Sequence, residues 1–363
     1  MKNTLGNSVS VTLFGESHGE SIGAVIDGLA PGITVDEKYI ASRLALRRPS
    51  GKTGTKRVEK DNFRIISGVF GGKTTGTPLC IIIPNENVKS KDYDQTSFLA
   101  RPGHADYTAR CKYHGYEDFR GSGHFSGRLT AAITAAGAIL EYALEQKGIY
   151  IGTHIARCAK INDRNFKNYN EDIKTLGKMK FAALDENKGK QMQEAIIAAG
   201  KDGDSVGGIL ETAIIGLPAG LGEPWFDSLE SVLSHALFSI PAVKGVQFGN
   251  AFKNVDLPGS KYNDAFTVED GKVITKTNNN AGINGGISNG MPVVFSCAVK
   301  PTPSIYKKQS TVDLNKMEES VIEIKGRHDP AVIHRARAVV DAVTAIVIAD
   351  MLALRYGTDY LGE

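Results

Sequence analysis

The sequence predicts a single α+β domain over residues 1–363, in which strands pack against long buried helices. Three observations predict this class. Short β-branched and apolar runs alternate with glycine-rich turns, two alanine-rich segments have the length and apolarity of core helices, and one strand-turn-helix pattern occurs twice. The repeated turns are AVIDGLAPG at 24–32 and TAIIGLPAG at 212–220, which precede helical stretches at 35–48 and 226–238. An internal duplication with pseudo-twofold symmetry would explain the repeat, and chance similarity over nine residues is the alternative.

The chain opens with two strands and a helix. SVSVTLF at 8–14 is β-branched and apolar, and SIGAVIDGLAPG at 21–32 is a second strand that ends in a glycine-proline turn. The Thr34-x-x-Glu37 pattern is typical of a capping box and predicts a helix that Pro49 stops. The C-terminal end of that helix presents three cations, namely Arg43, Arg47 and Arg48.

The next elements are two strands and a long helix. Residues 63–70 and 78–84 have strand character on either side of a GGKTTG turn. The segment 127–147 is rich in alanine, shows helical periodicity and follows Ser126, a candidate N-cap. It therefore predicts a long buried helix.

The second half contains a polar interruption and another core helix. A charged stretch around 160–182 is expected to form a surface insertion, and the helix-like QMQEAIIAAG at 191–200 follows it. The stretch 325–357 has Asp329 at a predicted N-cap and Pro330 at the first helical position, ahead of a long apolar run. We therefore expect a second long buried helix near the C-terminus.

Composition excludes several classes of protein. A hydrophobic content of 41% supports a substantial core, and no run has the length and apolarity of a signal peptide or a membrane span. Four widely spaced cysteines without a C-x-x-C pattern signal neither a disulfide framework nor a thiolate metal site, which favours the reducing cytoplasm. The net charge of +3 is too small to indicate nucleic-acid binding by itself.

The stretch FGESHGE at 14–20 contains Gly15-x-Ser17-x-Gly19, which matches the nucleophile elbow of serine hydrolases. An elbow needs a strand before the serine and a helix after it, because that sharp turn exposes the hydroxyl. Here the serine is followed by a second predicted strand. We therefore expect a polar link between two strands, and a serine hydrolase remains the rival enzyme class.

Several short segments combine histidine, arginine and glycine outside any amphipathic pattern: GESHG at 15–19, RRPSGK at 47–52, RPGHADY at 101–107, GSGHFSGR at 121–128, KPTPS at 300–304 and GRHDP at 326–330. Guanidinium groups beside glycine-freed backbone amides suit a phosphate or carboxylate ligand. His18 and His104 lie in these segments and can exchange protons near neutral pH.

Each of these residues also has a purely structural interpretation. A single loop histidine is more often a hydrogen-bonded structural residue than a catalytic one, and Asp329 before Pro330 suffices as a helix cap. Arg47 and Arg48 could simply complement the helix dipole. No histidine and carboxylate pair has a zinc spacing such as H-E-x-x-H, so the sequence predicts no metal site.

Longer segments resemble one enzyme family. GESHGESIGAVIDGLAPG at 15–32, RPGHADYTARCKYHGYEDFRGSGHFSGRLTAAITAAGAI at 101–139 and GRHDPAVIHRARAVVDAVTAIVIADML at 326–352 are similar to the three signature regions of chorismate synthases. SIPAVKGVQFG, NNNAGINGGISNG and VKPTPS lie between them in the expected order. The resemblance runs nearly end to end. One departure is that the family commonly has R-S-S-A-R where this chain has HFSGR at 124–128.

The resemblance implies a reaction and a fold. The reaction is an anti 1,4-elimination in which 5-enolpyruvylshikimate 3-phosphate loses phosphate and a ring proton to give chorismate, the last step of the shikimate pathway. The family requires reduced FMN, which is thought to lend an electron as phosphate leaves and to take it back. The implied fold is a β-α-β sandwich, and the implied assembly is a homotetramer. The reductant of the flavin, NADPH or a separate reductase, stays open.

The resemblance also implies roles for individual residues. His18 would protonate the leaving phosphate, His104 would lie by the flavin N1 region, and Asp329 would assist proton removal through flavin N5. Substrate anions, or in part a nicotinamide cofactor, would be bound by Ser17, Arg47, Arg48, Arg101 and Arg128. The flavin would be held by His124, Phe125, Ser126, Pro241, Ala242, Gly285, Lys300, Pro301, Thr302, Pro303, Ser304 and Arg327.

A non-enzyme alternative is an anion- or RNA-binding protein that uses the arginine loops. RNA binders usually interleave exposed aromatic and basic residues on a sheet. Here aromatic residues make up only 7% of the chain and fall mostly in apolar contexts. We therefore expect a small-molecule enzyme without a nucleic-acid or membrane partner.

Overall fold

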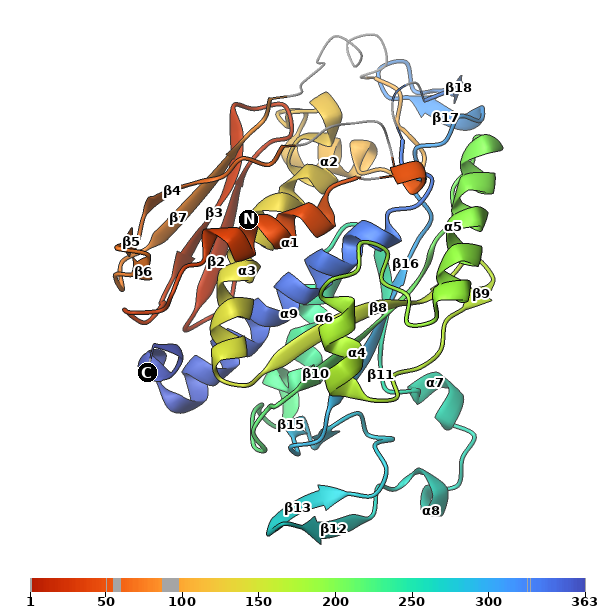
Figure 1. Cartoon of the computed structure of the whole chain (residues 1–363). Helices are drawn as coiled ribbons and strands as arrows, with labels where there is room; N and C mark the ends of the chain where they lie inside the picture. Colours follow the sequence, from red (N-terminus) through yellow and green to blue (C-terminus); the bar gives the residue numbers. More distant parts are fainter. Residues whose placement is uncertain are drawn as a thin grey trace.

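Two five-stranded antiparallel sheets form the framework of the protein (Figure 1). The computed structural model describes residues 2–49, 51–54, 60–86, 98–324, 326 and 328–362. The first sheet has the order β1-β2-β3-β7-β4, with bounds Thr4–Leu5, Ser10–Gly15, Ser21–Asp27, Leu79–Pro84 and Arg64–Ser67. The second has the order β11-β16-β10-β8-β9, with bounds Val243–Phe248, Val293–Val299, Gly208–Ile215, Tyr150–Cys158 and Ile161–Asn162.

Helices cover the sheets and connect their strands. The helices are α1 Glu37–Arg47, α2 Asp106–Tyr113, α3 Thr130–Gln146, α4 Tyr169–Leu176, α5 Glu186–Lys201, α6 Leu229–Phe238, α7 Ala251–Asn254, α8 Gly259–Tyr262 and α9 Ile333–Tyr356. Four small hairpins complete the fold: β5 Val69–Phe70 with β6 Lys73–Thr74, β12 Phe266–Glu269 with β13 Lys272–Thr275, β14 Ile283–Asn284 with β15 Ile287–Ser288, and β17 Gln309–Asp313 with β18 Glu318–Ile322. This mixture of helix and antiparallel sheet confirms the α+β class.

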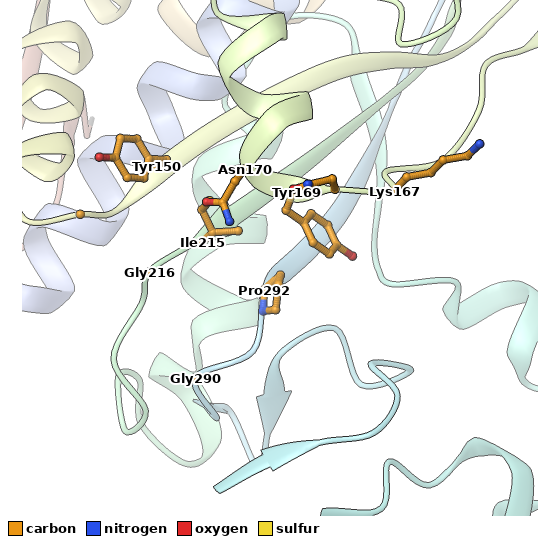
Figure 2. A pocket seen from close by; sticks show the side chains of 10 residues that line it. Tyr150, Lys167, Tyr169, Asn170, Ile215, Gly216, Gly290 and Pro292 are labelled. Atoms are coloured by element: carbon orange, nitrogen blue, oxygen red, sulfur yellow. The ribbon is translucent and has the colours of Figure 1, made fainter. Parts of the chain in front are cut away.

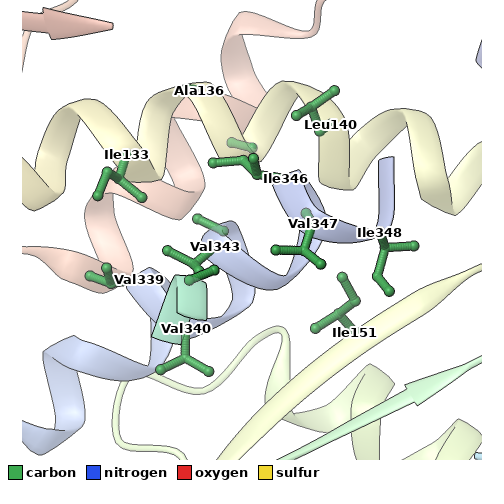
Figure 3. Close-up of a cluster of buried hydrophobic side chains, with 14 of the residues drawn as sticks. Ile133, Ala136, Leu140, Ile151, Val339, Val340, Val343, Ile346, Val347 and Ile348 are labelled. Carbon is green, nitrogen blue, oxygen red and sulfur yellow. The ribbon is translucent and has the colours of Figure 1, made fainter. Parts of the chain in front are cut away.

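The core lies between the two sheets, where α3 and α9 pack against each other (Figure 1). Helix α3 also packs on β3 and β7, and α9 packs on β8 and β10. Figure 3 shows aliphatic side chains of the two helices meeting there, with Ile133 and Leu140 on α3 and Val343 and Ile346 on α9. The helices approach closely at Gly137, where an added Cβ would lie 2.4 Å from the Ala342 Cβ. Both predicted long buried helices are thereby confirmed.

The predicted ends of the helices are partly wrong. Helix α1 is capped by Asp36, whose carboxylate accepts hydrogen bonds from the backbone amides of residues 38 and 39, and not by Thr34. Ser126 does cap the single 3₁₀ turn that leads into α3. Helix α9 begins at Ile333 after Val332, so Asp329 is not its N-cap. The Asp329 carboxylate forms an ion pair with Arg335.

The polar segment around 160–182 contains β9 and α4 and leads into α5. Its outward side chains are largely exposed, while Ile173 and Leu176 are buried against the second sheet. His154 on β8 fastens the segment, because its ring nitrogens lie 2.9 Å from Asp163 and 3.0 Å from Glu211. Across the described residues, no helix is both long and apolar enough to cross a bilayer.

Candidate active site

The GESHG segment is the tight link between β2 and β3, and it packs against the loop that precedes α3. The Ser17 backbone amide donates to the Gly123 carbonyl at 3.1 Å, and the His124 Nδ1 lies 2.8 Å from the Gly15 carbonyl oxygen. At Gly121 the backbone has φ +58°, and an added Cβ would lie 2.1 Å from the His18 Cε1. The His18 imidazole therefore rests directly on the Gly121 backbone.

The Ser17 hydroxyl has a structural environment that does not suit a nucleophile. It donates to the Gly121 carbonyl oxygen at 2.9 Å, and the side chain is 5% exposed. The His18 Nδ1 lies 3.1 Å from the Ser17 Oγ, which accepts from the ring because its own proton points to Gly121. A strand rather than a helix follows, so the serine hydrolase elbow is absent from this segment.

His104 lies in a second loop, between a backbone carbonyl and the segment that follows β16. Its Nδ1 is 3.1 Å from the Pro102 carbonyl oxygen and its Nε2 is 2.8 Å from the Ser304 Oγ. The same segments meet again where Lys300 Nζ donates to the Gly103 carbonyl at 2.7 Å. Burial, together with the nearby Arg101 charge, lowers the pKa of His104 to about 4. His104 is therefore neutral at physiological pH, with Nδ1 as donor and Nε2 as acceptor.

Arg101 connects the two histidine loops. Its guanidinium binds Asp106 in a bidentate fashion at 2.8 and 2.7 Å and donates to the Ser122 Oγ at 2.9 Å. Ser122 lies beside Gly121, on which His18 rests. The loops of residues 15–20, 101–106 and 120–126 therefore form one hydrogen-bonded unit.

Three of the predicted arginines gather around Asp61, a carboxylate whose side chain is 0% exposed. Arg128 forms a direct ion pair with it, and the Arg47 and Arg48 nitrogens lie 3.7 Å from it. Asn85 ties this cluster to the His18 loop, because its Oδ1 accepts from Arg128 at 3.1 Å and its Nδ2 donates to the carbonyls of residues 16 and 19. An anion at this cluster would lie near the His18 loop.

Asp329 joins the same cluster from the other side. It pairs with Arg335, whose Nε donates to the Arg47 carbonyl at 2.9 Å. Arg335 therefore links Asp329, the residue predicted to assist proton removal, to the end of α1 that carries Arg47 and Arg48.

The residues predicted to hold a flavin lie in several places. Lys300 donates its backbone amide to the Ala242 carbonyl at 2.9 Å, so Pro241 and Ala242 adjoin the 300–304 segment. Ala242 has φ +76°, a strained value for a residue with a side chain. In the same segment the Thr302 Oγ1 is buried without a hydrogen-bond partner among the described residues. Such an unsatisfied polar atom is expected where a ligand completes the site.

The other residues predicted to bind the flavin do not all contact the 300–304 segment. The side chains at 124–126 contact other parts of the protein. His124 contacts Gly15, and Phe125 packs edge-on against Tyr113 with ring centroids 5.9 Å apart. Ser126 caps a helical turn. Gly285 lies in the β14–β15 hairpin, beyond the end of β16 opposite to Lys300, which Figure 1 shows as the lower end of the second sheet. Arg327 lies outside the described residues.

Four residues of the site were not singled out from the sequence, namely Asp61, Asn85, Ser122 and Arg335. Asn85 follows directly after the β7 strand, and a polar residue at a strand end is a weak signal of a site. Asp61 gives no local signal, because its role depends on three arginines that are distant in sequence.

A separate hollow lies at the far end of the second sheet (Figure 2). It encloses about 520 Å³ and is lined by Gly148, Tyr150, Lys167, Asn168, Tyr169, Asn170, Ile215, Gly216, Gly290 and Pro292. No residue predicted for the active site lines it. Among the described residues, no group of three or more histidine, cysteine or acidic side chains could hold a metal ion.

Comparisons with known proteins identify the family of the chain. The family model described as chorismate synthase matches residues 9–353. A chorismate synthase of Pyrococcus abyssi is 46% identical over 350 residues, covering 96% of this chain and 97% of its own, and one of Dehalococcoides mccartyi is 44% identical over 359 residues, covering 98% of both. A crystal structure of chorismate synthase superposes with a TM-score of 0.77 at 26% identity, covering 97% of this chain and 94% of the other. The chain belongs to the chorismate synthase family.

Proposed function

We propose that this chain catalyses the anti 1,4-elimination of phosphate from 5-enolpyruvylshikimate 3-phosphate, which gives chorismate and completes the shikimate pathway. The observation that carries the proposal is the meeting of His18, His104 and an arginine cluster in one hydrogen-bonded set of loops. The substrate bears one phosphate and two carboxylates, so a site of this charge and polarity suits it.

His18 is the proposed general acid. Ser17 accepts from Nδ1, which fixes the plane of the ring. Nε2 is the nitrogen proposed to pass a proton to the departing phosphate. The Gly121 backbone lies against the same edge of the ring, because a Cβ added there would be 2.1 Å from Cε1 and 2.3 Å from Nδ1. Ser17 is therefore a positioning residue that adds a hydrogen bond and is not a nucleophile.

The arginines are the proposed anion clamp. Arg47 and Arg128 are almost fully buried and are held by Asp61. The Arg48 side chain is 29% exposed, and its buried Nε forms no hydrogen bond with the part of the chain that the structure describes. Arg48 is accordingly the member of the cluster best placed to meet a substrate anion. Arg101 would contribute from the His104 loop, and a nicotinamide cofactor is the alternative occupant of part of this surface.

The residues around Lys300 fit a bound flavin phosphate. Lys300 supplies a charge, and Thr302 supplies a hydroxyl that lacks a hydrogen-bond partner among the described residues. Neutral His104, with Ser304 beside it, would border the isoalloxazine ring. When bound, reduced FMN would supply electron density to the allylic system as phosphate leaves and would recover it afterwards. Asp329, held by Arg335, would assist removal of the ring proton.

A binding experiment tests the cofactor assignment without turnover. Oxidised FMN should bind with a visible spectral shift that strengthens when substrate is added. Thr302→Val keeps the size of the side chain but removes the hydroxyl, so FMN affinity should fall. A protein that binds no FMN in the presence of substrate would refute the assignment.

We also propose that the fold is a β-α-β sandwich that arose by duplication. The order of elements β2-β3-α1-β4-β7-α3 in the first half matches β8-β10-α6-β11-β16-α9 in the second, and the strand orders of the two sheets correspond. The repeated turns agree as well. Gly28 has φ +80° and Gly216 has φ +82°, and an added Cβ at either would meet a backbone oxygen two residues before the partner strand, at Ser8 and Gly148.

We further propose that the chain assembles as a homotetramer in the cytoplasm. The segment of α7, α8 and the β12–β13 hairpin projects from the second sheet (Figure 1). It exposes Phe252, Val255, Phe266, Val268 and Val273, each by more than 60%. A two-stranded hairpin is marginal in water, so contact with another copy would stabilise it. Sedimentation at micromolar concentration should show a tetramer, and a monomer would contradict the assembly.

A further inference from the structure

Residues 179–182, which we call the strap, join α4 to α5 and cross over the ends of α1 and α9. Each strap residue contacts a different part of the fold: the Met179 carbonyl accepts from Arg337, the Lys180 Nζ donates to the Ala45 carbonyl, the Phe181 ring stacks 6.1 Å from that of His334, and the Ala182 carbonyl accepts from Ile155 at 2.7 Å. The strap therefore reaches the end of α1 that carries Arg47 and Arg48.

The last turn of α1 presents backbone carbonyls that no helical amide satisfies. Two cations satisfy two of them. The Lys180 ammonium binds the carbonyl of Ala45, and the Arg335 guanidinium binds the carbonyl of Arg47 at 2.9 Å. Arg48 follows immediately as the C-cap residue, with its amide on the Leu44 carbonyl at 3.1 Å. Lys180 thus helps to fix the turn from which Arg47 and Arg48 extend.

The charges around the Lys180 ammonium are mostly positive. Burial, and then the Arg48, Arg335 and Arg337 charges, lower the pKa of Lys180 to about 8. His334 lies on the same side and is kept neutral by burial, which lowers its pKa to about 4. Two carboxylates of this region pair with other cations, Asp329 with Arg335 and Asp341 with Arg43 and Arg337.

We propose that Lys180 is a positioning residue for the substrate anion, which holds the Arg47–Arg48 turn and supplies a charge that the bound anion stabilises. This inference rests on the proposed role of Arg48 in binding that anion. An anion beside Arg48 favours the protonated ammonium, because opposite charges at close range raise the pKa of a lysine. Above about pH 8, where part of the free protein has lost this proton, substrate binding should therefore take up a proton.

Calorimetric titration of the substrate measures this coupling directly. The protein is held with oxidised FMN, which prevents turnover, at about pH 8.5 in two buffers of different ionisation enthalpy. The wild type should take up a fraction of a proton on binding. Lys180→Met should bind about tenfold more weakly without that uptake, because it removes a charged hydrogen bond. Lys180→Arg should retain most of the affinity and also show no uptake, because arginine stays protonated.

Lys178→Met is the matched control, since Lys178 is an exposed lysine two residues away, and it should behave as the wild type does. Lys180→Met with wild-type affinity and wild-type proton uptake would overturn the inference. If that variant does not fold, Lys180→Arg decides, because uptake equal to that of the wild type would overturn it as well. Failure of the proposed function is distinct: the wild type would then bind no substrate, or Arg48→Ala would bind it unchanged.

Discussion

Replacing Gly121 with alanine would push a methyl group into the imidazole of His18. The new Cβ would lie 2.1 Å from Cε1 and 2.3 Å from Nδ1 of His18, and 2.9 Å from the Ser17 Oγ. Carbon atoms in ordinary contact are about 3.5 Å apart, so the ring would have to move by more than about 1 Å. The variant would therefore move the His18 imidazole without replacing it.

The size of the effect follows from this displacement. A misplacement of about 1 Å at a reacting group can cost about 100-fold in rate, or about 2.7 kcal/mol in the activation barrier. Alanine also disfavours the left-handed backbone, where Gly121 has φ +58°, by roughly 1–2 kcal/mol of folding stability. Gly115 provides the control, because it has φ +83° and an added Cβ there would meet no atom within 4 Å. Gly115→Ala therefore carries the backbone cost without the clash.

The assay is anaerobic chorismate formation with reduced FMN, accompanied by thermal unfolding of each variant. Gly121→Ala should lose about 100-fold in turnover, while Gly115→Ala should keep nearly full turnover and a similar melting temperature. Equal turnover of the two variants would refute the position of His18 as a proton donor that rests on Gly121.

The remaining predictions concern single side chains. His18→Ala should lower turnover about 10²- to 10⁴-fold, whereas Ser17→Ala should raise the barrier by only about 0.5 to 1.5 kcal/mol. A larger loss for Ser17→Ala in single-turnover experiments would contradict the assignment of the proton to His18. Arg48→Ala should weaken substrate binding by about 1.5 to 3 kcal/mol, and an unchanged KM would make Arg48 a solvated helix-end charge. Burial disfavours the charged form of His154, but its two carboxylate partners outweigh burial and raise its pKa. Its stabilising contribution is thus complete below about pH 6.5 and is lost as pH rises through the raised pKa. In denaturant titrations, the unfolding free energy of His154→Gln should fall less steeply than that of the wild type as pH rises through the raised pKa. Equal slopes for the two proteins would show that His154 does not cause the fall.

The sequence correctly predicted several elements that depend only on neighbouring residues. The β2 and β3 strands have continuous β-branched and apolar runs, Pro49 lies just beyond the last residues of α1, and Ser126 caps the turn into α3. The link that carries His18 was correctly predicted as a connection between strands, since no helical periodicity follows Ser17.

Features that depend on distant partners could not be predicted in this way. Asp61 is important only because three arginines from two helical regions converge on it. Asp329 precedes Pro330 as a helix cap would, yet α9 begins only at Ile333 and the Asp329 carboxylate pairs with Arg335. Lys180 belongs to a polar stretch that has no sequence signal of a site, and only the folded strap brings it to the end of α1.

Anaerobic mixing of the protein with chemically reduced FMN and 5-enolpyruvylshikimate 3-phosphate tests the central claim most directly, with chorismate followed by its absorbance and phosphate by its release. Chorismate and phosphate should appear in equal amounts, over many turnovers and without net oxidation of the flavin, because the elimination is redox-neutral. A folded protein that binds both FMN and the substrate but forms no chorismate under these conditions would contradict the proposed activity.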